Sequence, residues 1–144
     1  MVGIRGEAMK ELIPQRDPMI MIDVLHDATE SEAVTGLTIA EGNLFCSEGF
    51  FEEPGLVEHI AQSASAFAGY KAKIADCPIP LGFIGEVKKC IIHFLPSVGD
   101  VLHTQIRVLT EALGITLLTA ETKVNDEVAV QCRMKIYLAL KDER

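Results

Sequence analysis

An unbroken stretch from Pro54 to Lys73 constrains the fold more than any other feature of the sequence, because between its charged ends it is apolar or small on every side. It is long enough for a helix and too long for an ordinary strand. Pro54 suits a first helical position. Glu58 lies near the start and Lys71 and Lys73 near the end, which complements the helix dipole. A helix that is apolar all round is buried, so the sequence predicts one buried helix here.

The same stretch is rich in small residues, which let other parts of the backbone approach a helix closely. This composition indicates that another part of the chain wraps around the helix. The small residues are Ala61, Ser63, Ala64, Ser65, Ala66, Ala68 and Gly69.

The rest of the chain has the patterns of strands and turns. Pro14 and Pro18 exclude a long helix near the N-terminus, and Asn125 and Asp126 are typical of a two-residue hairpin. Strand patterns occur at residues 19–25 and 33–39 before the helix, and at residues 90–95, 101–109, 115–124 and 128–138 after it. This order predicts an α+β fold in which a single antiparallel β-sheet wraps one central buried helix.

A length of 144 residues suits one substantial core, so we expect residues 1–144 to form a single domain. The chain has 13 Lys and Arg against 21 Asp and Glu, and this net charge of −8 argues against binding to nucleic acid or to an anionic membrane. No apolar run is long enough to span a bilayer, and no export signal is visible. The four cysteines are scattered and no His/Cys cluster has metal-ligand spacing, so we expect a cytoplasmic protein with reduced thiols and without metal or cofactor.

Three parts of the sequence carry a family resemblance. Residues 12–18 (LIPQRDP), followed by residues 21–23 (MID), are similar to an opening motif LPHRxPxxxxD, and residues 54–62 (PGLVEHIAQ) to a motif PGxxxxExxAQ. Residues 82–89 and 94–100 resemble a strand and turn of the form F…GxxxxxFxxPVxPGD. These are motifs of the hot-dog fold 3-hydroxyacyl-acyl carrier protein dehydratases. The resemblance is strongest to the divergent dehydratase-like proteins of aryl-polyene and flexirubin-type pigment clusters.

The resemblance implies a lyase that dehydrates a 3-hydroxyacyl thioester, and it places the acid–base residue at Glu58. Gln62, four residues later, can hydrogen-bond and orient that carboxylate, and backbone N–H groups near Gly55 are candidate donors to the thioester oxygen. The loop His of the family is replaced by Phe50. His59 is therefore the candidate second catalytic group, and the alternative is a structural histidine at an interface.

The implied substrate is a thioester of acyl carrier protein or of coenzyme A, in fatty-acid or polyene-type biosynthesis. The resemblance also implies a homodimer or higher homo-oligomer, because the open edges of such a sheet are paired in the family. Two other functions stay open: a hot-dog acyl thioesterase, and a non-catalytic acyl-binding or scaffold subunit, which Phe50 favours. An acidic carrier needs a local basic patch on an acidic chain. Candidates for it are Lys71, Lys73, Lys88, Lys89, Arg133 and Lys135.

Overall fold

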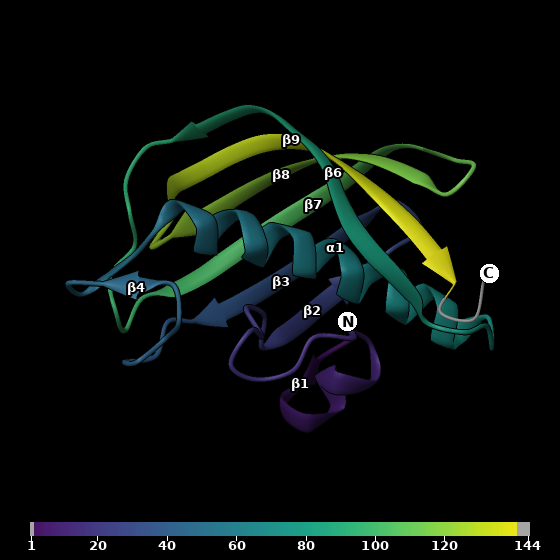
Figure 1. Cartoon of the computed structure of the whole chain (residues 1–144), viewed down its shortest axis with the longest axis horizontal. Helices are drawn as coiled ribbons and strands as arrows, with labels where there is room; N and C mark the ends of the chain where they lie inside the picture. Colours follow the sequence, from purple (N-terminus) through teal and green to yellow (C-terminus); the bar gives the residue numbers. More distant parts are fainter. Residues whose placement is uncertain (1, 141–144) are drawn as a thin grey trace.

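The computed structural model describes residues 2–140 and shows one long helix against a large antiparallel sheet (Figure 1). The helix α1 (Glu53–Ile74) lies along the inner face of the curved sheet. A short 3-10 helix, η1 (Gly6–Glu11), precedes most of the strands. The strands are β1 (Ile4–Arg5), β2 (Val24–Ala28), β3 (Glu32–Thr38), β4 (Cys46–Ser47), β5 (Phe50–Phe51), β6 (Pro80–Ile92), β7 (Val101–Ala112), β8 (Ile115–Val124) and β9 (Glu127–Leu140). This is the hot-dog architecture that the sequence predicts.

The large sheet has the strand order β1-β2-β3-β7-β8-β9-β6, and every neighbouring pair is antiparallel. A separate hairpin of β4 and β5 leads into the start of α1. The predicted turn between β8 and β9 is confirmed: Asn125 and Asp126 have φ angles of 50° and 67°, the left-handed values that a type I′ hairpin turn requires at both positions.

The core lies between α1 and the inner face of the sheet. On β7 the side chains of Leu102, Thr104 and Ile106 are fully buried while the residues between them are exposed, which is the period-two pattern of a half-buried strand. On α1 every residue from Gln62 to Phe67 is buried. The predicted burial of the helix is therefore confirmed.

The N-terminal segment wraps over the middle of α1, as the small residues of the helix indicate. A Cβ atom added at Gly69 would overlap the carbonyl oxygen of Leu12, and Leu12 itself is fully buried. A second apolar cluster forms here, in which Met9, Leu12 and Ile13 pack with Phe67. Glycine at position 69 is thus what allows this segment to lie directly on the helix.

Two predicted strands have the wrong bounds. Residues 19–23 form no strand, although Met21 and Ile22 are buried, because the backbone of Met21 is bound by side chains of α1 instead of by a neighbouring strand. Residues 90–95 contain only the end of β6, which begins at Pro80. The first part of β6 was missed because most of its residues are exposed and alternation is interrupted by register shifts between Ile84 and Glu86 and between Lys88 and Ile91.

No helix within residues 2–140 is long and apolar enough to cross a membrane. The four cysteines Cys46, Cys77, Cys90 and Cys132 are all free thiols.

We expect Gly69→Ala to lower the free energy of unfolding by about 3 kcal/mol, at the upper end of the usual range for overpacking, because the new methyl group meets the backbone of Leu12 rather than a flexible side chain. Urea unfolding measures this change. The matched control is Gly82→Ala, where an added Cβ would lie 3.4 Å from the nearest atom of Leu138, an ordinary contact. Equal stability of the two variants would contradict the close approach.

Candidate active site

Glu58 lies in the second turn of α1, and its side chain is partly buried. Its Oε2 atom accepts a hydrogen bond from Nε2 of Gln62 at 2.8 Å, as the spacing of four residues allows. Within residues 2–140, Gln62 is the one residue that hydrogen-bonds this carboxylate. The bond fixes the direction of the carboxylate, and Oε1 has no hydrogen-bond partner among the described residues.

Gln62 is fully buried and is held on three sides. Its Oε1 atom accepts the backbone N–H of Met21 at 2.6 Å, and its Nε2 atom donates to the carbonyl of Met19 at 2.7 Å as well as to Glu58. Because an N–H faces the oxygen and two acceptors face the nitrogen, only one orientation of the amide satisfies all three bonds. Gln62 therefore ties the segment before β2 to the helix and positions Glu58.

His59 is fully buried on the adjacent face of the helix. Nδ1 lies 2.7 Å from the carbonyl oxygen of Met21, and Nε2 lies 2.7 Å from Oγ1 of Thr104. A carbonyl only accepts, so Nδ1 carries the proton and Nε2 accepts from Thr104. Thr104 in turn lies 2.8 Å from Oγ1 of Thr122. Both ring nitrogens are thus bonded to groups of the core.

Burial lowers the pKa of His59 to about 4, against the smaller opposing effect of its bond to Met21. The imidazole is therefore neutral near pH 7. This geometry gives His59 a structural task and leaves neither nitrogen for a substrate. Its role as a second catalytic group stays a prediction, and the structural alternative has the support of the hydrogen bonds.

Gly55 is buried at the start of α1, and its N–H donates to the carbonyl of Glu52 at 2.9 Å. A Cβ atom added there would lie 2.6 Å from the ring of Phe51 and 2.8 Å from Cβ of Phe45. Close packing of the β4–β5 hairpin on the helix therefore requires glycine at this position. A role of the Gly55 N–H in binding the thioester oxygen stays a prediction.

Phe50, which the sequence resemblance places where a catalytic histidine is expected, is 48% exposed on β5. Its neighbour Phe51 is fully buried, and the Phe51 N–H donates to the carbonyl of Pro96 at 2.7 Å. Cys46 lies on the partner strand β4, and burial raises the pKa of its thiol, so it is not an activated nucleophile. The hairpin therefore presents an apolar ring, not a general base, beside the start of the helix.

The other three histidines lie away from α1. His26 on β2 and His103 on β7 stack on each other with ring centroids 5.9 Å apart, and His93 follows the end of β6. Within the described part of the chain no group of three or more His, Cys, Asp or Glu residues is arranged to hold a metal ion.

We expect His59→Asn to lower stability near pH 7 and to flatten its pH dependence. The unfolded chain binds a proton at His59 below about pH 6.5, whereas the folded protein does so only near pH 4. Lowering the pH across this window therefore favours the unfolded state. At about 1.4 kcal/mol per pKa unit, the wild type should lose about 3 kcal/mol more than the variant. Urea unfolding at a series of pH values measures the difference, and parallel curves for the two proteins would contradict it.

Comparisons with known proteins show the family of this chain. Residues 7–143 match the family model described as ApeP-like, ApeP dehydratase. The chain is 29% identical over 141 residues to the 3-hydroxyacyl-[acyl-carrier-protein] dehydratase FabZ of Oceanobacillus iheyensis, covering 94% of this chain and 97% of the relative. It is 26% identical over 138 residues to FabZ of Macrococcus caseolyticus, covering 92% and 93%.

Among solved structures, the dehydratase heterocomplex ApeI:P from Xenorhabdus doucetiae contains a chain that superposes with a TM-score of 0.86. The two chains share 19% identity over 94% of this chain and 93% of the other, a likeness that supports the fold. Since the family model spans nearly the whole sequence, the chain belongs to the ApeP-like dehydratases of the hot-dog fold.

Proposed function

We propose that this protein dehydrates a 3-hydroxyacyl thioester carried by acyl carrier protein or coenzyme A, with Glu58 as the acid–base residue. The observation that carries the proposal is the carboxylate of Glu58 in the first turns of α1, with one oxygen held by Gln62 at 2.8 Å and the other without a hydrogen-bond partner among the described residues. The FabZ relatives are named for this reaction on acyl carrier protein. The free thiols support a reducing, cytoplasmic location.

The proposed reaction uses one carboxylate twice. Oε1 of Glu58 takes the proton from C2 of the substrate, and the electron pair of that C–H bond forms an enolate on the thioester. The enolate then expels the C3 hydroxyl, which takes the proton from Glu58 and leaves as water while the C2–C3 double bond forms. The carboxylate is regenerated, so atoms and charge balance without a cofactor. Gln62 is a positioning residue because it acts through Glu58.

We expect Glu58→Gln to lower turnover by about 10²–10⁴-fold, the usual loss for an acid–base group. Glutamine has nearly the same shape, so the free energy of unfolding should change by no more than about 1–2 kcal/mol. The assay follows formation of the enoyl thioester from the 3-hydroxyacyl thioester.

Glu53→Gln is the matched control, because Glu53 is an exposed carboxylate in the first turn of the same helix. It should retain wild-type turnover. Unchanged turnover of Glu58→Gln would contradict the proposed acid–base role and favour the non-catalytic acyl-binding alternative.

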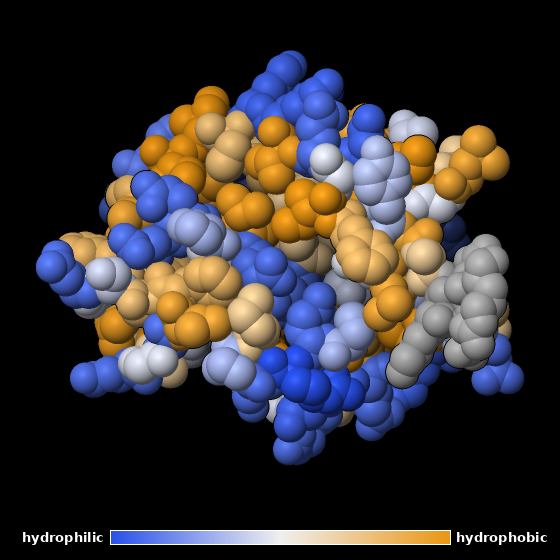
Figure 2. All heavy atoms as spheres, viewed as in Figure 1, coloured by the Kyte–Doolittle hydropathy of each residue, from blue (hydrophilic) through white to orange (hydrophobic). Residues whose placement is uncertain are grey.

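We also propose that a second copy of the chain pairs with the free edge of β6. The opposite edge is β1, which has 2 residues, whereas β6 has 13 and, among the described residues, pairs only with β9. Phe83, Ile84 and Ile91 on β6 are each at least 40% exposed, and apolar residues follow the course of this strand in the space-filling view (Figure 2). A long apolar edge of this kind favours pairing with another strand.

The protein should therefore sediment as a dimer or larger assembly at micromolar concentration, and a 15.7 kDa monomer would contradict the proposal. Phe83→Lys should weaken the assembly because it places a charge on the paired edge. Val101→Lys is the matched control, since Val101 is equally exposed, at 57% against 58%, but lies on β7 in the interior of the sheet order.

A further inference from the structure

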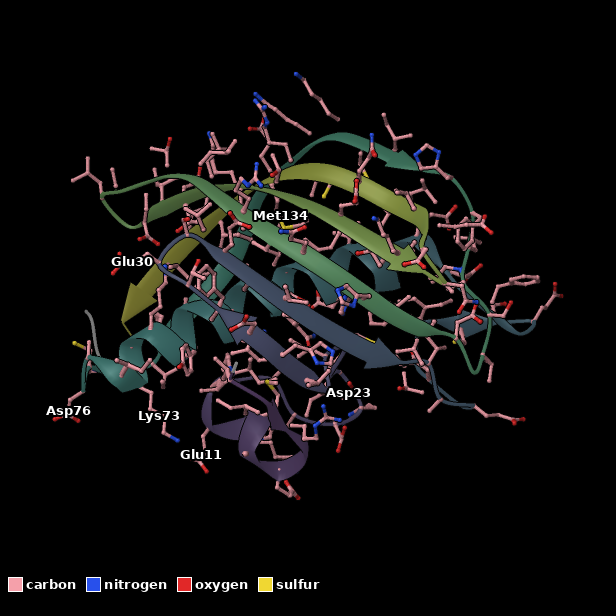
Figure 3. The ribbon with its side chains drawn as sticks, turned by 180° about the vertical axis from the view of Figure 1, so that it is seen from behind. Glu11, Asp23, Glu30, Lys73, Asp76 and Met134 are labelled. Carbon is pink, nitrogen blue, oxygen red and sulfur yellow. The ribbon has the colours of Figure 1, made fainter. Side chains whose placement is uncertain are left out.

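The outer face of the sheet, which points away from α1, carries a shallow depression of about 350 Å³. Figure 3 shows the sheet from this side, with nitrogen-tipped side chains gathered along its upper part. The depression is lined mainly by hydrogen-bond donors and contains one carboxylate. Its polar lining residues are Lys89, Gln105, Arg107, Thr119, Glu121, Gln131 and Arg133.

The register of the sheet brings the cations of this depression together. Thr119 on β8 is paired with Arg107 of β7 on one side and with Arg133 of β9 on the other. The two arginine backbones are therefore about 10 Å apart, two strand spacings, and both side chains can reach over Thr119. Arg133 is also paired with Lys88 of β6. Like charges directly opposite each other in a sheet are destabilising.

Lys89 joins this group through a break in the strand. It lies within the register shift between Lys88 and Ile91, and its φ angle of 51° is in the left-handed region, which is unfavourable for a residue other than glycine. In a regular strand Lys88 and Lys89 would point to opposite faces. Here the irregularity places Lys89 in the lining of the depression beside Arg133. Such bulges re-aim side chains and concentrate near functional sites.

Two of the cations have no carboxylate to neutralise them. Arg107 lies 3.7 Å from Glu32, and Lys88 lies 3.6 Å from Glu86, but Arg133 and Lys89 form no ion pair within residues 2–140. Positive charge is therefore concentrated here despite a net charge of −8, and despite the unfavourable backbone of Lys89 and the like-charge pair of Lys88 and Arg133.

We propose that this depression is a binding site for a phosphate-type dianion, either free or as the phosphoryl group of a larger ligand. Guanidinium groups bind such oxyanions in a bidentate manner, and the amide of Gln131 and the hydroxyl of Thr119 offer further donors, whereas the amide of Gln105 donates to Glu32 at 2.9 Å. Glu32 and Glu86 lie beside the cations of this face, at 3.7 Å from Arg107 and 3.6 Å from Lys88, and Glu121 is in the lining. These carboxylates disfavour a broad acidic protein surface more than a small anion that contacts Arg133 and Lys89. The site is on the opposite face of the sheet from Glu58 and is independent of the proposed dehydration.

Isothermal titration of the full-length protein with inorganic phosphate, at constant ionic strength, tests the proposal. We expect saturable binding of one phosphate per chain, weakened about tenfold or more by Arg133→Gln, because a charge-assisted hydrogen bond of typical strength is lost. Lys10→Gln removes the same charge from η1, which contributes no residue to the lining of the depression. This control variant should leave the affinity unchanged. Absence of saturable binding, or equal affinity of Arg133→Gln and Lys10→Gln, would overturn the proposal.

Lys89→Gly distinguishes loss of the binding site from loss of folding stability. Glycine accepts the left-handed backbone at this position, so the urea midpoint should not fall, whereas phosphate affinity should weaken as for Arg133→Gln. Retained affinity in this variant counts against the site.

A parallel titration with glycerol 2-phosphate distinguishes the two sources of the anion. Tighter binding than inorganic phosphate points to a phosphorylated ligand, and equal binding points to the free ion. Binding of polyglutamate without any binding of phosphate would show an acidic protein surface instead and overturn the proposal.

Discussion

The hydrogen bonds that His59 and Gln62 make to the backbone of residues 19–21 are the interaction on which the rest of this structure depends. Both side chains lie inside the core, where an unpaired polar group costs about 1–3 kcal/mol. Their partners include the N–H and carbonyl groups of Met21, which is buried, so these groups would otherwise be unpaired themselves. The helix and the segment before β2 therefore supply each other's hydrogen-bond partners. Moving either one would leave buried polar groups of both unpaired.

The same hydrogen bonds also position the carboxylate of Glu58. The amide oxygen of Gln62 accepts a hydrogen bond from Met21, and one amide hydrogen is donated to Met19. The remaining hydrogen is donated to Glu58 and fixes the direction of its carboxylate. A carboxylate that is positioned by a rigid group needs no reorganisation when a proton moves, which is how preorganised sites lower a barrier. His59 supports the same helix turn from the other side through Thr104 and Thr122. Glu58, the proposed acid–base group, is thus positioned by residues of the core whose own polar atoms are hydrogen-bonded.

Local sequence patterns predicted those elements whose structure depends on residues close together in the chain. The buried helix, the hairpin at Asn125 and Asp126, and the bounds of β8 follow from composition, turn chemistry and alternation. The hydrogen bond between Gln62 and Glu58 follows from their spacing. The loss of strand structure at residues 19–23 could not be predicted in this way, because it depends on side chains about forty positions later in the chain. The burial of His59 is a similar case, since its partner Thr104 comes from a distant strand.

The central claim is that the Glu58 site removes water from a 3-hydroxyacyl thioester, and the mass of the carrier-bound product tests it most directly. Intact-mass spectrometry of a 3-hydroxyacyl carrier protein incubated with this protein should show the loss of one water, with the thioester retained. Release of the carrier as a free thiol would show a thioesterase, and an unchanged mass on a range of acyl chains would show a binding subunit. Either of these results would contradict the account.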